Sequence, residues 1–161
     1  MSKPTTQKIA VLSSEVRIAT INDQDFICLT DIARHKGTAT TDDLIRNWLR
    51  NRNTVEFLGL WEQINNPGFN PVEFDGIRMQ AGLNSFTLTP KQWIERTGAI
   101  GIQSKTGRYG GTYAHSDIAF EFAAWISVEF KLYLIKEFQR LKESERQSIG
   151  WDIRRNLARI N

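Results

Sequence analysis

The 161-residue chain has one cysteine, two histidines and four prolines, and it contains no long hydrophobic run. A single cysteine, Cys28, cannot form a disulfide within the chain, which fits a reducing compartment. No apolar stretch approaches the roughly 20 residues that a helix needs to span a bilayer, and no signal segment opens the sequence. We therefore expect a cytoplasmic, nucleoid-associated protein without a membrane partner.

Recognisable catalytic and metal-binding motifs are also absent from the sequence. His35 and His115 stand singly, without the spacing of metal ligands, and no serine lies in a nucleophile elbow. Cys28 lies between Ile27 and Leu29 and is predicted to be a small core residue. We therefore expect no enzyme activity, no metal and no cofactor. The acids that a metal-dependent nuclease would have to use are Glu62, Glu73, Asp75 and Asp117.

The charged residues that are present are unevenly distributed. The net charge is only +3. Four basic residues and one acidic residue lie in 91–113, three acidic residues and no basic residue in 114–130, and eight basic and four acidic residues in 131–161. Two basic zones thus flank an acidic, apolar stretch, a pattern compatible with a nucleic-acid partner but also common in soluble domains that bind nothing charged.

Hydrophobic periodicity predicts an α+β fold, with a small antiparallel sheet packed by several helices. Residues 1–14 are predicted to be a flexible lead-in, 15–146 the folded domain, and 147–161 a C-terminal helix that can begin a further region. Strands are expected at 15–21, 26–29, 85–88 and in a hairpin over 99–113. Helices are expected at 31–35, 42–49, 55–64, 90–97, 117–126, 128–145 and 151–160, and a loop at 65–71.

A basic cluster lies on and just after the helix at 42–49. Apolar residues of this helix fall on one face, so the basic residues fall on the other face or just past its end. Arginine can donate two hydrogen bonds at once to the edge of a guanine base or to a phosphate. A solvated helix end explains the same pattern, since the helix dipole also favours arginine there. The candidate residues are Arg46, Arg50 and Arg52.

A glycine-rich hairpin tip is the second candidate region. Its glycines let the backbone approach a phosphate closely, and its polar residues are all usable DNA ligands. It lacks the Gly-Lys-Ser/Thr ending of a nucleotide-binding loop. A plain solvent-facing hairpin is the alternative. The candidate residues are Gln103, Ser104, Lys105, Thr106, Arg108 and Tyr109.

Several of these segments together resemble the KilA-N domain, found in phage, poxvirus and bacterial proteins. The matching segments are Trp-Leu-Arg-Asn at 48–51, Gly-Leu-Asn-Ser-Phe at 82–86, Thr-Gly-Ala-Ile-Gly at 97–101, Gly-Arg-Tyr-Gly-Gly-Thr-Tyr-Ala at 107–114, and Asp-Ile-Ala at 117–119. The likeness runs over roughly residues 18–142.

This resemblance implies a DNA-binding module, related to the fungal APSES type, with a winged-helix-like arrangement. By position, Gln103, Ser104, Lys105, Arg108 and Tyr109 would belong to its wing. We predict binding of double-stranded DNA in regulation or phage-related control. The alternatives are a protein-interaction module, such as an antirepressor that binds another regulatory protein, and, more remotely, the nuclease.

Overall fold

The computed structural model describes residues 5–37, 40–107 and 110–160. Five strands form one antiparallel sheet in the order β1-β2-β3-β5-β4. The strands are β1 Thr5–Val11, β2 Ser14–Ile21, β3 Gln24–Cys28, β4 Ile102–Lys105 and β5 Gly111–His115. The helices are α1 Leu29–Arg34, α2 Thr41–Leu49, α3 Arg52–Asn65, α4 Pro71–Gln80, α5 Pro90–Thr97, α6 Ser116–Ile126 and α7 Val128–Ile160. The predicted α+β class is confirmed.

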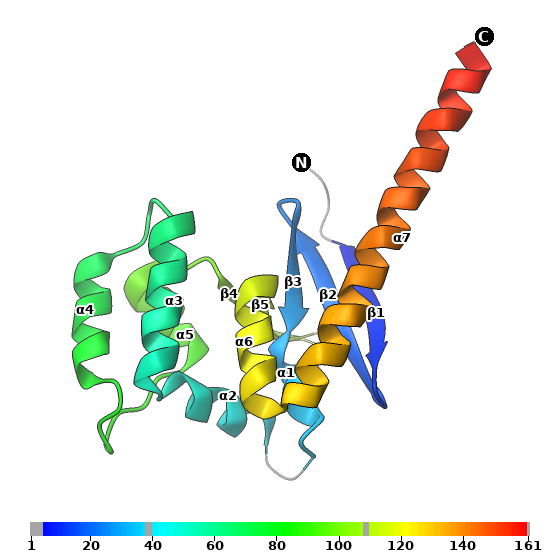
Figure 1. Cartoon of the computed structure of the whole chain (residues 1–161). Coiled ribbons are helices and arrows are strands. Elements are labelled where there is room, and N and C mark those ends of the chain that lie inside the picture. The colour runs from blue at the N-terminus through cyan, green and yellow to red at the C-terminus, as the bar shows by residue number, and fades with distance from the viewer. Residues whose placement is uncertain (1–4, 38–39, 108–109, 161) are drawn as a thin grey trace.

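The helices form two groups around the sheet (Figure 1). Helices α6 and α7 lie across one face, with α6 against β3 and β5 and α7 against β1. Helices α3, α4 and α5 form the second group. They pack against one another, and α5 contacts β4, the edge strand of the sheet opposite β1. The second half of α7 extends away from the body.

Among the described residues, the apolar stretches of the helices are too short or too charged for any of them to cross a membrane.

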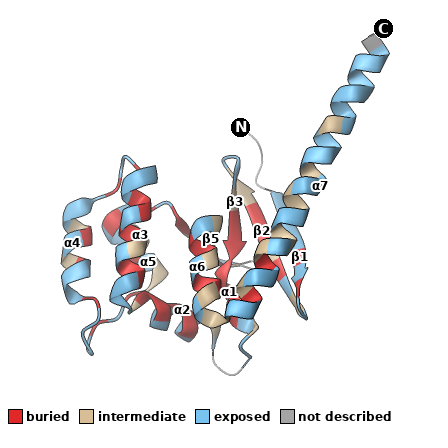
Figure 2. Ribbon diagram, viewed as in Figure 1, coloured by how far each residue is buried: buried red, intermediate tan, exposed pale blue. Residues whose placement is uncertain are grey.

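The strands bury side chains on both faces of the sheet. Successive residues of a strand point to opposite faces. Ile18 and Ile27 therefore face the helices and join the main core, whereas Cys28 and Tyr113 form a smaller cluster on the opposite face with Phe26. Figure 2 shows that buried residues fill the body while the outer half of α7 is largely exposed. The β4–β5 hairpin is therefore anchored in the sheet, because β5 pairs with β3 and its residues Tyr113 and Ala114 are buried.

Two local signals in the sequence are confirmed in detail. Asn22 and Asp23 both have positive φ, 52° and 64°, as the tight turn between β2 and β3 requires. Thr89 and Gln92 form a reciprocal capping box at the start of α5, and Gly98 ends the helix at φ 70°. The orientation of α5, which directly precedes the β4–β5 hairpin, is therefore fixed at both ends.

Two predictions of secondary structure are wrong, and one helix, α4, was not predicted. Part of the expected lead-in, residues 5–11, forms β1 and pairs with β2 along its whole length. The segment after the loop at 65–70 forms α4, which begins at a proline that Asn70 caps. The segment 86–88 lies outside the sheet, although Phe86 and Leu88 are buried as an alternating strand would require.

Helix boundaries differ from the predicted ones at three places. The two C-terminal helices expected at 128–145 and 151–160 are one continuous helix, α7. α1 begins at Leu29, so Thr30 lies inside it instead of capping it. His115, not Ser116, caps α6, because its Nδ1 accepts a hydrogen bond from the backbone N–H of Asp117. α6 is also less buried than expected, since the side chain of Trp125 is exposed.

Candidate nucleic-acid interface

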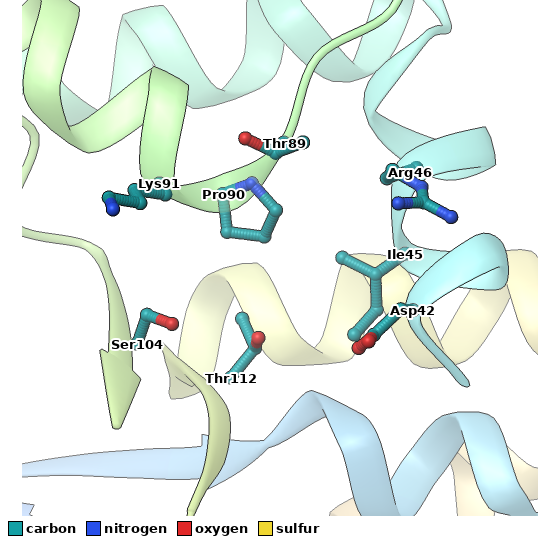
Figure 3. Close-up of a pocket in the computed structure, with 8 residues that line it drawn as sticks. All are labelled: Asp42, Ile45, Arg46, Thr89, Pro90, Lys91, Ser104 and Thr112. Carbon is teal, nitrogen blue, oxygen red and sulfur yellow. The ribbon is translucent and has the colours of Figure 1, made fainter. Parts of the chain in front are cut away.

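Three elements converge on one hollow of about 210 Å³: α2, the start of α5 and the β4–β5 hairpin. Figure 3 shows Arg46 and Lys91 on opposite sides of this hollow, with the side chains of Ser104 and Thr112 between them on the side of the sheet. We refer to the hairpin, residues 102–115, as the wing. The residues that line the hollow are Asp42, Ile45, Arg46, Thr89, Pro90, Lys91, Ser104 and Thr112.

Helix α2 holds Arg46 rigidly at this hollow. The side chains of Leu44, Ile45, Trp48 and Leu49 are buried, so this helix presents its opposite face to solvent. Arg46 forms an ion pair with Asp43, and hydrogen bonds from the Thr40 hydroxyl and from Arg46 lower the pKa of Asp43. Arg46 is therefore partly neutralised within its own helix.

The two other arginines of the predicted cluster lie further along the chain and are held differently. Arg50 donates a hydrogen bond of 3.0 Å to the carbonyl of Asn84 and lines a second hollow, of about 280 Å³, together with Asn47 and Gly82. Arg52 begins α3, is exposed, and pairs with Glu56 at 3.3 Å. The structure thus brings Arg46 to the wing and α5, and places Arg50 beside the turn at 82–84.

The outgoing strand β4 and the residue after it carry polar side chains at or near the surface of the wing. Ser104 and Thr106 are exposed, whereas Gln103 and Lys105 are half-buried. The ammonium of Lys105 lies 5.1 Å from the centre of the Tyr113 ring, a favourable cation–π distance. Two predicted site residues, Arg108 and Tyr109, lie outside the described residues.

Helix α5 contributes Lys91, which sequence reasoning did not single out as a ligand. Lys91 stands in the first turn, where backbone N–H groups and the helix dipole favour an anion. Its ammonium is 3.9 Å from Glu95 and its side chain is 78% exposed, so this pair is weak. The helix-start signature at 89–92 predicted the helix correctly, but only the fold shows that this start faces the wing.

The hollow is electrostatically mixed. Arg46 and Lys91 supply two positive charges, and Asp42 supplies one negative charge. The hydroxyls of Ser104 and Thr112 add neutral groups that can donate hydrogen bonds. Because Asp43 also pairs with Arg46, acidic and basic groups are balanced around the hollow.

The acids that a nuclease would need have separate structural partners. Glu62 is 1% exposed and accepts hydrogen bonds from Ile100 N, Gly101 N and Asn66 Nδ2. Glu73 pairs with Arg96 and Asp75 with Arg78, each on or beside α4. Asp117 accepts a hydrogen bond of 3.1 Å from Trp61 Nε1. Across 5–37, 40–107 and 110–160, no three His, Cys, Asp or Glu residues are grouped so that they could hold a metal ion.

Cys28 is confirmed as a core residue, with no exposed surface. Burial raises the pKa of its thiol, which works against formation of a thiolate nucleophile.

Comparison with protein families matches the KilA-N domain over residues 11–144, which is most of the chain. Comparison with curated proteins and with solved structures gave no match. The family match covers α2, α5, the wing and the hollow between them.

Proposed function

The chain belongs to the KilA-N domain family, whose domains generally bind DNA, and from this premise we propose that it binds double-stranded DNA through the face formed by the wing, the start of α5 and Arg46. The observation that carries the proposal is the convergence of these three elements on one hollow of about 210 Å³. A face of this kind combines a helix end, a hairpin and basic side chains.

Each element has a distinct role in this proposal. Arg46 and Lys91 hold a backbone phosphate in the hollow and so fix the register of the domain on the duplex. The wing, with Gln103, Ser104 and Lys105, contacts the adjacent groove, and Thr106, Arg108 and Tyr109 are further candidate ligands. Because the wing and the hollow are contiguous, a duplex can contact both without a change of fold.

Arg50 and Arg52 are secondary phosphate contacts in this proposal. Arg50 caps the C-terminus of α2, one turn after Arg46, and its hydrogen bond to Asn84 leaves further guanidinium donors for a phosphate. Arg52 must give up its exposed pair with Glu56, which costs little. Both contacts would increase affinity for the duplex without distinguishing one base sequence from another.

We propose a regulatory role, such as control of a promoter, in which the domain acts by occupying its DNA site. A protein-interaction function is a second candidate, and one observation favours it. The outer part of α7 exposes Ile149, Trp151, Ile153 and Leu157, each by more than half, and exposed apolar groups of this size are typical of protein contacts.

Selection of bound sequences from a random pool of duplexes tests the proposal directly. We expect enrichment of a common sequence, confirmed by a shift of that duplex in gel electrophoresis and by weaker binding to scrambled duplex. Failure to retain any duplex at low salt would contradict DNA binding. Capture of a partner protein with no retained duplex would favour the second candidate.

A further inference from the structure

A partly buried arginine connects the wing to the centre of the sheet. Arg17 lies on β2, and its side chain is 14% exposed. Its Nε donates a hydrogen bond of 2.9 Å to Asp31 Oδ2, and its Nη2 lies 3.1 Å from Asp31 Oδ1. The same Nη2 lies 3.3 Å from the carbonyl oxygen of Gly110, where the chain enters the return strand of the wing. One guanidinium thus joins β2, α1 and the wing.

Asp31 is the residue that holds this guanidinium in place. It is 3% exposed, and it also accepts a hydrogen bond of 2.9 Å from the backbone N–H of Arg17. The hydrogen bonds to Asp31 raise the pKa of Arg17 above its ordinary value, so the positive charge is permanent. A buried pair of this geometry is costly to break on one side only, because the remaining charge loses its partner.

The wing segment beside Arg17 has no side chains of its own with which to pack before Thr112. It begins with Gly110 and Gly111, and a Cβ at Gly111 would lie 3.2 Å from Cys28 Sγ and 3.3 Å from Thr30 Oγ. The next residue, Thr112, donates its backbone N–H to Thr30 Oγ at 3.1 Å. The start of this strand is therefore held by two hydrogen bonds, from Arg17 to the Gly110 carbonyl and from the Thr112 N–H to Thr30, whereas its later residues pair with β3 and β4.

We propose that the Arg17–Asp31 pair positions the wing for DNA binding, with Arg17 as a positioning residue that does not touch the duplex. This inference rests on the proposed function. The planar guanidinium can bridge a carboxylate and a carbonyl at once, whereas a lysine ammonium has a single nitrogen that cannot span both acceptors. Loss of the guanidinium frees the Gly110 end of the wing and leaves the hollow beside α5 incomplete.

Arg34 offers a matched control within the same cluster. It donates a hydrogen bond of 2.7 Å to Asp31 Oδ1, but its side chain is 62% exposed, and within the described part of the chain it makes no hydrogen bond or ion pair with the wing. Arg34→Met and Arg17→Met each remove one guanidinium from the same carboxylate. Only Arg17→Met removes the bond to Gly110.

The test measures amide hydrogen exchange and duplex affinity for the full chain carrying Arg17→Met, Arg17→Lys or Arg34→Met. We expect both Arg17 variants to speed exchange at the backbone amides of Gly110 and Thr112, while the amides of the β1–β2 pairing stay protected. We expect their affinity for the selected duplex to fall about tenfold, equivalent to about 1.4 kcal/mol. Arg34→Met should leave both readouts near those of the unchanged protein. Arg17→Lys keeps the positive charge beside Asp31, so it is the variant to measure if Arg17→Met does not fold.

Lys105→Ala separates failure of this inference from failure of the proposed function. If Lys105→Ala weakens duplex binding but Arg17→Lys changes neither wing exchange nor affinity, the inference is overturned and the proposed function stands. If the unchanged protein binds no duplex, the proposed function fails, and the inference about DNA affinity fails with it. Equal effects of Arg34→Met and Arg17→Lys would also overturn the inference, because they would indicate general destabilisation around Asp31.

Discussion

Glu62 Oε2 accepts a hydrogen bond of 2.8 Å from the backbone N–H of Gly101, so a buried carboxylate of α3 holds the residue that leads into the wing. Glu62 Oε1 accepts a second backbone hydrogen bond, of 2.9 Å, from Ile100. The carbonyl of Gly101 in turn accepts from the backbone N–H of His115 at the other end of the wing. Both strands of the wing are therefore tied to one acidic side chain in the helical half of the molecule.

Replacement of Glu62 by alanine should destabilise the fold strongly. The change leaves the N–H groups of Ile100 and Gly101 and the amide of Asn66 without their acceptor, which should cost about 3 kcal/mol of unfolding free energy. Urea unfolding followed by tryptophan fluorescence measures this. Glu56→Ala, an exposed position on the same helix, is the control and should cost less than about 1 kcal/mol. Equal losses for the two variants would show that Glu62 does not hold the wing.

Two helical glycines should respond to alanine in opposite directions. A Cβ at Gly59 would overlap the ring of Phe74, whereas a Cβ at Gly150 has nothing within 4 Å. Gly59→Ala should therefore destabilise by about 1–3 kcal/mol through overpacking. Gly150→Ala should stabilise by up to about 1 kcal/mol through helix propensity, since Gly150 lies in the exposed part of α7. Thermal unfolding of both variants measures the difference, and a stabilised Gly59→Ala would contradict the packing of α3 on α4.

The thiol of Cys28 should be unreactive in the folded protein. Its side chain is fully buried, and burial raises its pKa, so a smaller fraction is thiolate at pH 8 than in an ordinary cysteine. A colorimetric thiol reagent at pH 8 should detect no fast-reacting group until denaturant is added, and one group per chain thereafter. Immediate reaction of the native protein would contradict the burial of Cys28 between β3 and the wing.

Much of the fold could be predicted because its signals are local. The β2–β3 hairpin has its own turn residues, and α5 has a capping box and a glycine stop, so each could be recognised from a few residues. β1 was missed because the turn that joins it to β2 uses Leu12 at φ 55°, and leucine is not a typical turn residue. Its edge position also leaves only Ile9 and Val11 buried, too few for a clear alternating pattern.

The helical half of the molecule was harder to predict. In α4 only Phe74 and Ile77 are buried, and Pro71 and Gly76 are typical of loops, although Pro71 in fact occupies the first helical turn. Gly150 lies between the two helices that were predicted at 128–145 and 151–160, but a single glycine in a long helix costs only about 1 kcal/mol and does not end it. Phe86 and Leu88 alternate as in a strand, yet no neighbouring strand pairs with them among the residues that the structure describes.

The candidate site could be predicted only in part, because it depends on contacts between distant segments. The sequence identified Arg46 and the wing separately, and the fold brings them to one hollow. Lys91 could not be recognised from its own neighbourhood, since an exposed lysine in a first helical turn is ordinary. Arg17 lies in a strand 93 residues before Gly110, and no local pattern links the two.

The salt dependence of duplex binding tests the central claim most directly. Each phosphate that the protein neutralises contributes about −0.9 to the slope of log K against log salt. Fluorescence anisotropy of a labelled duplex over a salt series would compare the unchanged protein with Lys105→Ala/Arg108→Ala and with Arg154→Ala/Arg155→Ala, which removes the same charge from the outer part of α7. The account predicts a steep slope for the unchanged protein and the α7 variant, and a slope shallower by about two phosphates for the wing variant. Identical slopes and affinities for all three proteins would contradict DNA binding through the wing.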